Sequence, residues 1–169
     1  GDPNTAQAYA DAIATLYPVA YTLKFASKRE LDKDYVVMPL EALWWAPNMA
    51  SFTTERDKSR WLWTAMIMVP EWISGAMFEA AIAKVAAKDR PVGLDKLRLE
   101  FLFEGRCVQT LHVGRYDDEA DVLAKLHDEF IPTAGLRMAG RHHEIYLSDA
   151  RKVDPSKLRT ILRQPVVQA

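Results

Sequence analysis

Four side chains capable of acid–base or metal chemistry lie close together near the C-terminus, in the stretch GRHHEIYLSDARK. They are His142, His143, Glu144 and Tyr146. In an extended strand, alternate side chains point to opposite faces, so His142, Glu144 and Tyr146 share one face and His143 lies on the other. The two histidines therefore cannot reach one ion unless the strand is distorted.

The two faces of this predicted strand differ in polarity. Ile145 and Leu147 are expected to face the core, so Glu144 points to solvent or into a polar-lined cavity. A lone carboxylate on a strand is most often solvated, but burial in an aromatic pocket would raise its pKa and make it a general base. It could equally be the counter-charge for a cation, with Tyr146 donating a hydrogen bond to the same ligand.

A metal centre is an alternative use of these residues. His142, Glu144 and His112 would make a set of two histidines and one carboxylate. The sequence contains no HExxH, CxxC, GxGxxG or P-loop pattern, so we predict neither a metal nor a cofactor. Cys107 is the single cysteine and is interpreted as a buried small residue.

Tryptophan is concentrated in one part of the chain. The five tryptophans are Trp44, Trp45, Trp61, Trp63 and Trp72. Each alone could be core or surface packing, but one small core rarely needs so many close together, and rigid indoles make good walls for an aromatic ligand. We therefore predict a pocket for a planar apolar or cationic molecule. Trp44 and Trp45 point opposite ways, so one of them is expected to join the layer of Trp61 and Trp63.

The elements that position these residues are predicted from periodicity and turn residues. Helices are predicted at 3–28, 74–88 and 117–135. Strands are predicted at 35–46, 59–70, 97–114 on both sides of Gly105, 142–149 and, after a short turn, at the end of 154–166. A long polar hairpin loop is predicted at 46–58.

Prolines, a helix cap and a buried stripe add detail to the predicted elements. Pro18 predicts a kink or two joined helices, and Pro39 confines its strand to an edge, a bulge or two short pieces. Ser74 is the expected cap of the second helix. The buried stripe of the third helix is predicted to be Val122, Leu123, Leu126 and Phe130.

The order of the elements predicts the fold class. A β-α-β-β unit used twice, with pseudo-twofold symmetry, gives a mostly antiparallel sheet with helices on one side, which is an α+β architecture. We expect one domain over 1–169, with halves of about 1–90 and 91–169. The second unit has its leading strand at 107–113, whereas nothing precedes the helix of the first.

Charge and composition exclude several functions. The chain has 22 basic and 23 acidic residues and a net charge of −1, which gives no electrostatic footprint for nucleic acid. No apolar run approaches the ~20 residues needed to span a bilayer. One cysteine suits a cytoplasmic protein, and we expect a monomer or a weak homodimer.

Several strings together resemble the GyrI-like small-molecule-binding proteins, in their stand-alone bacterial branch. The strings are GDPN, LKF, PLEALWW, LRLEFLFEGRCVQTLHVGRYDDE and HHEIYLSDARKVDPSKLRTILRQPV. The resemblance implies a ligand groove between two β-α-β-β halves. Relatives include the drug-sensing domains of multidrug-responsive activators, and some stand-alone members hydrolyse cyclopropanoid DNA-alkylating antibiotics of the yatakemycin and CC-1065 type, which links them to antibiotic resistance.

The resemblance also assigns site residues. It places the cavity glutamate at Glu144, followed by Tyr146, and a cavity-rim tyrosine at Tyr116. The aromatic walls and further ligand contacts are then Trp44, Trp45, Trp61, Trp63, Trp72 and His112.

This sequence departs from the family pattern at two places. Family members carry a strand before GDPN, so either a preceding segment supplies it or the sheet edge is open. Ala42 stands where the family has glycine. Its methyl group would slightly narrow the space beside the backbone at this position.

Three functions are compatible with these residues. The first is a cofactor-independent cyclopropanoid hydrolase, with Glu144 as general base and Tyr146 as hydrogen-bond donor. The second is a protein that binds or sequesters cationic aromatic drugs without turnover, with Glu144 as counter-charge. The third, an interaction protein acting on gyrase, is ranked last because the charge gives no DNA mimicry. The stand-alone domain and the tryptophan content favour the first narrowly.

Overall fold

The computed structural model describes residues 7–46 and 61–169, which form two compact units. The sheet unit contains residues 39–46, 61–64 and 103–169. The helical unit contains residues 7–38 and 65–102. The predicted polar loop at 46–58 lies, apart from Ala46, outside the described residues.

The helical unit is built on α1 (Gln7–Leu31) and α2 (Gly75–Lys88), which pack against each other. Their shared core is apolar and consists of Val19, Leu23, Ile73, Phe78, Ala81, Val85 and Leu94. The predicted cap of α2 is confirmed, because the Ser74 hydroxyl accepts a hydrogen bond from the Met77 N–H at 3.1 Å. A short 3₁₀ turn, η3 (Leu94–Lys96), follows.

Pro18 does not divide α1. The expectation of two joined helices is wrong, because one helix runs through this position. Proline supplies no N–H to the helix, and the hydroxyl of Thr22 donates to the Pro18 carbonyl at 2.7 Å one turn later. Thr15 makes the same kind of bond to the carbonyl of Asp11.

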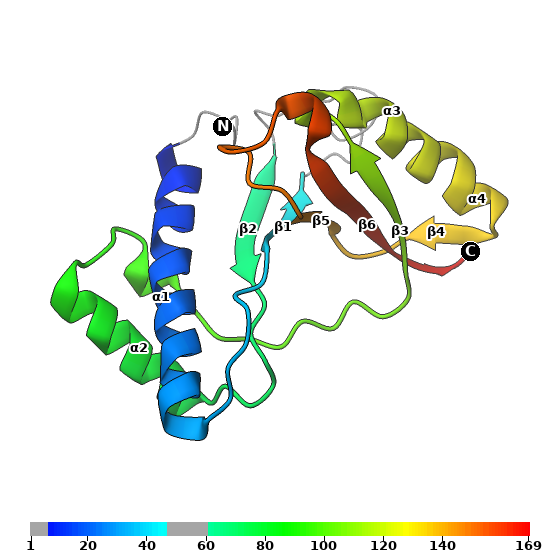
Figure 1. Ribbon diagram of the computed structural model, residues 1–169. Helices are drawn as coiled ribbons and strands as arrows, with labels where there is room; N and C mark the ends of the chain where they lie inside the picture. The colour runs from blue at the N-terminus through cyan, green and yellow to red at the C-terminus, as the bar shows by residue number, and fades with distance from the viewer. Residues whose placement is uncertain (1–6, 47–60) are drawn as a thin grey trace. The chain divides into compact units, whose positions relative to one another are not determined.

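A six-stranded antiparallel sheet, which belongs to the sheet unit except for the second half of β2, confirms the predicted α+β class (Figure 1). Its strands are β1 (Leu40–Trp45), β2 (Leu62–Ile67), β3 (Cys107–Val113), β4 (Leu136–Met138), β5 (His142–Tyr146) and β6 (Arg159–Gln168). Their order is β2-β1-β5-β6-β3, and β4 also pairs with β6. The long strand β6 is central, because β5, β3 and β4 all pair with it. A short 3₁₀ turn, η6 (Pro155–Lys157), leads into β6, as predicted.

Three strand boundaries differ from prediction. The first strand begins only after Pro39, which has no N–H for a ladder. Residues 97–104 form no strand, and β3 begins after Gly105, whose φ of 69° ends the extended segment before it. Residues 136–138, predicted as loop, form β4 because they pair with the end of β6.

A continuous helical run follows β3. It comprises η4 (Tyr116–Asp118), α3 (Glu119–Ala124), the π-helical turn η5 (Lys125–Phe130) and α4 (Ile131–Thr133). In the π-helical turn, the Ile131 N–H donates to the Leu126 carbonyl five residues earlier. Pro132 follows immediately and has no N–H to continue the normal helical pattern.

The π-helical turn changes which residues of this run are buried. Phe130, predicted to be in the buried stripe, is 55% exposed, whereas Ile131 is 1% exposed. The wider turns move the buried position to every fourth residue, so Leu123, His127 and Ile131 face inward. The predicted stripe is therefore correct at its start and wrong at its end.

The helical run covers one face of the sheet, here called the covered face. Leu126 and Ile131 pack there with Val166 of β6 and Val108 of β3. Leu162, at the centre of β6, is fully buried on this face. The opposite face is called the outer face, and Leu111 of β3 is 45% exposed on it.

The burial of β5 differs in part from what was expected, because both of its faces carry buried side chains. Leu147 is 41% exposed rather than core, and it lies on the outer face. Glu144 lies on the covered face and is buried. Glu144 is buried because the helical run packs on this face and brings polar side chains to it. The residue pattern of β5 alone cannot show which element packs there.

Within residues 7–46 and 61–169, no helix has both the length and the apolar character needed to cross a membrane.

Candidate functional site

Glu144 is the centre of a buried polar network on the covered face. Its Oε2 accepts a hydrogen bond from His142 Nε2 at 2.9 Å, and its Oε1 accepts one from the Tyr146 hydroxyl at 3.3 Å. All three residues come from alternate positions of β5, as the predicted alternation requires. Ala42 of β1 lies directly opposite Glu144 and is fully buried, so its methyl group is accommodated beside the carboxylate.

Aromatic side chains surround this network. The Trp44 indole N–H donates to the Tyr146 hydroxyl at 2.9 Å. The Trp61 ring meets Trp44 edge to face, with centroids 5.7 Å apart, and Tyr116 meets Tyr146 in the same way at 5.7 Å. Aromatic residues from β1, the residue before β2, the helical run and β5 therefore form a cluster that is linked to Glu144 through Tyr146.

The carboxyl of Glu144 is held in its ionised form. Burial alone would raise its pKa, but the hydrogen bond and charge of His142, followed by hydrogen bonds from Glu119 and Tyr146, lower the pKa below its usual value. Tyr116 behaves oppositely. Burial, followed by the charges of Glu119 and Glu144, raises its pKa to about 12, so its hydroxyl keeps its proton.

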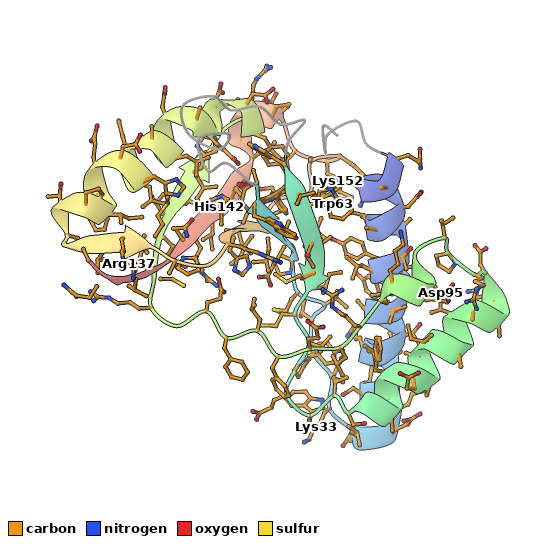
Figure 2. The ribbon with its side chains drawn as sticks, turned by 180° about the vertical axis from the view of Figure 1, so that it is seen from behind. Lys33, Trp63, Asp95, Arg137, His142 and Lys152 are labelled. Atoms are coloured by element: carbon orange, nitrogen blue, oxygen red, sulfur yellow. The ribbon has the colours of Figure 1, made fainter. Side chains whose placement is uncertain are left out.

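Two buried residues of the helical run complete the network. Glu119, the first residue of α3, is 3% exposed and, after His142, contributes to the lowered pKa of Glu144. His127, in the π-helical turn, is 5% exposed, and its ring meets His142 edge to face at 5.9 Å. His142 is labelled in Figure 2. Burial, followed by the charge of His142, lowers the pKa of His127 to about 4, so this ring is neutral near pH 7.

The structure brings only some of the predicted ligand-binding residues to Glu144. Trp63 is half-buried and follows Trp61 at strand spacing. Trp45 points to the outer face, where the guanidinium of Arg141 stacks on it at 3.6 Å from the ring centroid. Trp72 belongs to the helical unit, where its indole N–H donates to the Ser27 hydroxyl at 2.9 Å.

His112 lies on the covered face at the end of β3 and is buried. Its Nε2 bonds the backbone carbonyl of Arg115 at 2.9 Å. This bond closes the turn that leads to Tyr116. His112 therefore holds the backbone next to Tyr116. Among the described residues, no three His, Cys, Asp or Glu side chains are grouped as metal ligands.

A second buried polar group lies on the outer face, directly behind the first. His143 is 2% exposed, and its Nε2 bonds Glu41 at 2.6 Å while its Nδ1 bonds Glu104 at 2.9 Å. Arg163 approaches the same oxygen of Glu104 at 3.6 Å. Burial lowers the pKa of His143, but its bonds to Glu41 and Glu104 outweigh burial and raise it. The two histidines thus serve separate networks, as the alternation predicted.

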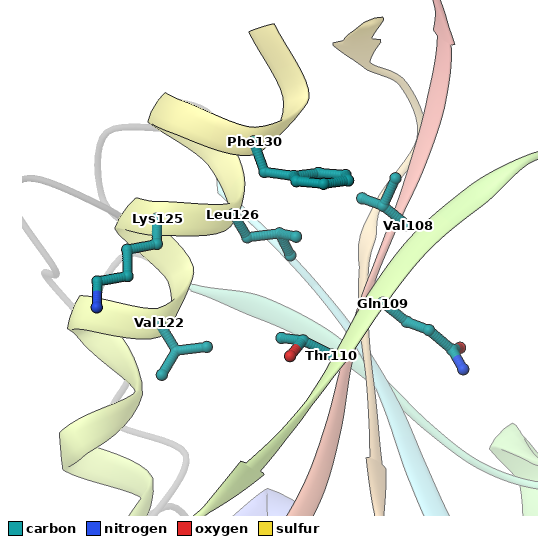
Figure 3. A pocket seen from close by; sticks show the side chains of 7 residues that line it. All are labelled: Val108, Gln109, Thr110, Val122, Lys125, Leu126 and Phe130. Atoms are coloured by element: carbon teal, nitrogen blue, oxygen red, sulfur yellow. The ribbon is translucent and has the colours of Figure 1, made fainter. Parts of the chain in front are cut away.

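A hollow of about 320 Å³ lies between the helical run and β3 (Figure 3). It is lined by Val108, Gln109, Thr110, Val122, Lys125, Leu126 and Phe130. Its lining is mainly apolar, and Lys125 points away from the strand. None of the predicted site residues lines it.

Sequence reasoning missed Glu119, His127, Glu41 and Glu104. Glu119 lies in an acidic stretch, DDEAD, that is typical of the solvated first turn of a helix. The signal that could have found it is its position four residues before Leu123, on the buried side of the helix. His127 required the π-helical turn, and Glu104 comes from a segment without regular structure.

Comparison with known proteins identifies the family. The sequence model of the GyrI-like small molecule binding domain matches residues 1–167, so the chain belongs to this family. No significant match was found among curated proteins.

Solved structures from Listeria innocua are similar over nearly the whole chain. An uncharacterized conserved protein is 38% identical with a TM-score of 0.87. A hydrolase is 37% identical with a TM-score of 0.83, and a hydrolase encoded by lin2189 is 38% identical with a TM-score of 0.84. Each comparison covers 99% of this chain and 83% of the other.

Proposed function

We propose that the sheet unit binds a planar aromatic molecule beside Trp44, Trp61 and Tyr116 and hydrolyses it with Glu144 as general base. The observation that carries this proposal is a buried carboxylate, held in its ionised form, that is linked through Tyr146 to a cluster of aromatic rings. Its pKa lies below the usual value, not above it as expected for a buried base, so Glu144 is ionised at neutral pH and is free to accept a proton from water. The hydrolases of similar structure from Listeria innocua support a reaction with water.

The substrate class follows from the family resemblance and suits the site. Cyclopropanoid alkylators of the yatakemycin and CC-1065 type carry a flat spirocyclopropyl dienone. Indole and phenol rings offer such a molecule broad apolar contact. The reaction needs no cofactor, because relief of ring strain and formation of an aromatic ring drive it.

The proposed reaction balances without a co-reactant. A water oxygen attacks the cyclopropane methylene, and its proton passes to Glu144. The cyclopropane C–C bond breaks, and its electron pair forms the aromatic ring and leaves negative charge on the former dienone oxygen. That oxygen takes up a proton and becomes a phenol, while the attacked carbon becomes a primary alcohol. Tyr146, whose hydroxyl already bonds Glu144, fixes the orientation of the base.

The test is incubation of the purified protein with a spirocyclopropyl dienone, followed by mass spectrometry for the ring-opened alcohol. Glu144→Gln should lower the rate by about 100-fold or more, because the amide cannot accept the proton. The matched control is Glu129→Gln, an exposed position in the same unit, which should turn over normally. Full turnover by Glu144→Gln would refute the assignment of the base.

A second function is favoured by one observation: the negative charge at Glu144 lies among aromatic rings, which together suit a cationic aromatic drug. In that case the protein sequesters the drug without chemical change. Equilibrium dialysis with a rhodamine-type dye should show binding that weakens in Glu144→Gln and persists in Glu129→Gln. Dye binding together with an unchanged dienone would favour sequestration over hydrolysis.

A further inference from the structure

Strand β3 is the last strand of the sheet, so one of its edges is open. Among the residues that the structure describes, β3 pairs with β6 alone. Native proteins protect such edges with charged side chains, proline or a bulge. Residues 107–113 contain no proline, lysine, arginine, aspartate or glutamate, and their register with β6 is unbroken. The free edge of β3 can therefore accept another extended chain.

The hydrogen bonds to β6 show which backbone groups of β3 face the free edge. At the two ends of the strand, the Gly114 N–H donates to the Leu158 carbonyl and the Arg106 carbonyl accepts from the Val166 N–H. Antiparallel strands exchange both bonds at every second pair, so even-numbered residues of β3 turn their N–H and C=O groups toward β6. The residues that turn these groups to the free edge are Cys107, Gln109, Leu111 and Val113. An extended peptide backbone matches such a row of donors and acceptors.

The hollow beneath the helical run lies beside the same strand (Figure 3). Val108 and Thr110 point toward the helical run, whereas Gln109 points to the opposite side. Directly opposite residues of paired strands share a face, so a peptide residue opposite Thr110 would place its side chain in the hollow. Phe130, whose ring is 55% exposed, forms part of the wall. The hollow therefore suits a large apolar side chain.

Charge favours a peptide with acidic ends over a second copy of this chain. Lys125 alone carries a charge among the residues that line the hollow. Arg106 and Arg115 flank β3, and both are exposed. An antiparallel pair of two β3 strands over 107–113 would bring Arg106 of each copy close to Arg115 of the other, which is unfavourable. The exposed acidic residues of the helical run do not line the hollow; they are Asp117, Asp118, Asp121, Asp128 and Glu129.

We propose that the groove between β3 and the helical run binds an extended peptide of a partner protein. The peptide adds antiparallel to β3, as every strand pair printed for this sheet does, and places an apolar side chain in the hollow. Acidic residues at its ends meet Lys125 and Arg106. Backbone hydrogen bonds supply affinity, and the hollow and the charges supply specificity. This groove is separate from Glu144 and is not used in the proposed hydrolysis.

A labelled synthetic peptide tests the strand addition. It has the length of β3, alternates valine and threonine around a central phenylalanine, and ends in aspartate on both sides. Fluorescence polarisation should show saturable binding to the protein. With the phenylalanine opposite Thr110, the residues on either side of it donate to β3, so N-methylation there should weaken binding about tenfold or more. N-methylation of the phenylalanine, whose N–H faces away from β3, should change affinity little. Equal weakening by the two modifications, or no binding, would overturn the proposal.

Two variants test the edge and the charge. Leu111→Pro removes an N–H that faces the free edge and keeps the ladder to β6, so it should abolish binding in a protein whose circular dichroism is unchanged. Lys125→Glu should weaken binding of the aspartate-ended peptide and favour the same peptide ending in lysine, whereas the exposed Lys157→Glu should bind like the wild type. If Leu111→Pro does not fold, the exchange of peptide preference in Lys125→Glu decides. An unchanged preference would contradict the placement of the peptide beside Lys125.

Sedimentation of the free protein checks the rival occupant. With the edge open to a partner peptide, the wild type and Leu111→Pro should both sediment as monomers. A dimer that dissociates in Leu111→Pro, together with a peptide that does not bind, would assign the edge to a second copy and overturn the proposal.

Discussion

The indole of Trp44 and the phenol of Tyr146 are joined by a hydrogen bond of 2.9 Å, and the same phenol donates onward to Glu144 at 3.3 Å. The hydroxyl of Tyr146 is therefore both acceptor and donor, and it links the aromatic cluster to the carboxylate. The bond spans two strands, β1 and β5, whose residues are 102 positions apart in the sequence. Its removal affects the stability of the sheet unit as well as the site.

Tyr146→Phe removes this link with little change in volume. The Trp44 N–H, buried in the aromatic cluster, loses its acceptor, and Glu144 loses one donor. We expect the free energy of unfolding to fall by about 1–3 kcal/mol, measured by urea denaturation. The control Tyr21→Phe, on an exposed side of α1, should unfold like the wild type. Equal stability of the two variants would show that the Trp44 bond contributes nothing.

His127 should make the protein less stable in acid. Its folded pKa of about 4 lies below the ordinary value of 6.5, so between these values the unfolded chain binds a proton that the native state does not. Stability contributed by the neutral ring is present above pH 6.5 and lost as pH falls toward 4. The loss amounts to about 3 kcal/mol. Urea unfolding across this range should show a shallower acid slope for His127→Leu, and an unchanged slope would contradict the buried neutral ring.

His143 should give a dependence of opposite sign. Its folded pKa lies above 6.5, because Glu41 and Glu104 hold its proton. Stability from this group is fully present below pH 6.5 and is lost as pH rises through the raised folded pKa. Glu41→Gln removes one of the two carboxylates, so the folded pKa of His143 should fall toward 6.5, and the loss of stability should be smaller and complete at lower pH. Urea unfolding on both sides of the ordinary histidine pKa measures the effect, with the exposed Glu79→Gln as control.

The π-helical turn predicts unequal costs for two adjacent truncations. Ile131→Ala should lower the free energy of unfolding by about 2–5 kcal/mol, because Ile131 is 1% exposed and packs with Leu126, Leu136 and Val166. Phe130→Ala should cost less than about 1 kcal/mol, because that ring is 55% exposed. Thermal or urea unfolding of the two variants decides the point. A larger loss of stability for Phe130→Ala than for Ile131→Ala would show that Phe130 is buried, as a regular helix predicts.

Much of the fold could be predicted from local patterns. Ser74 and the apolar spacing of 75–88 define α2, because a cap and a buried stripe are encoded by neighbouring residues. The alternation of β5 correctly separates His142 from His143, because successive side chains of a strand always point to opposite faces. Pro39 and Pro18 show the limit of such rules: β1 begins only after Pro39 instead of continuing through it, and Pro18 is accommodated inside a continuous helix.

The site was predicted only in part, because its partners come from distant segments. Glu144 and Tyr146 share one strand, so their proximity is visible in the sequence. Glu119 and His127 reach the same place only because a helix with a π-helical turn covers that face of the sheet. The residue pattern of a strand does not show which distant element packs on it.

The presence of buried polar networks on both faces of β5 also bears on folding fidelity. Most strands are held in register by an apolar face, and a shift of one residue is penalised because that face turns to water. In β5 the same shift would turn Glu144 toward Glu41 and Glu104 and would turn His143 toward His127. Glu144 would then stand beside Glu41 and Glu104 in place of His143, so a misregistered sheet is opposed by charge repulsion as well as by lost burial.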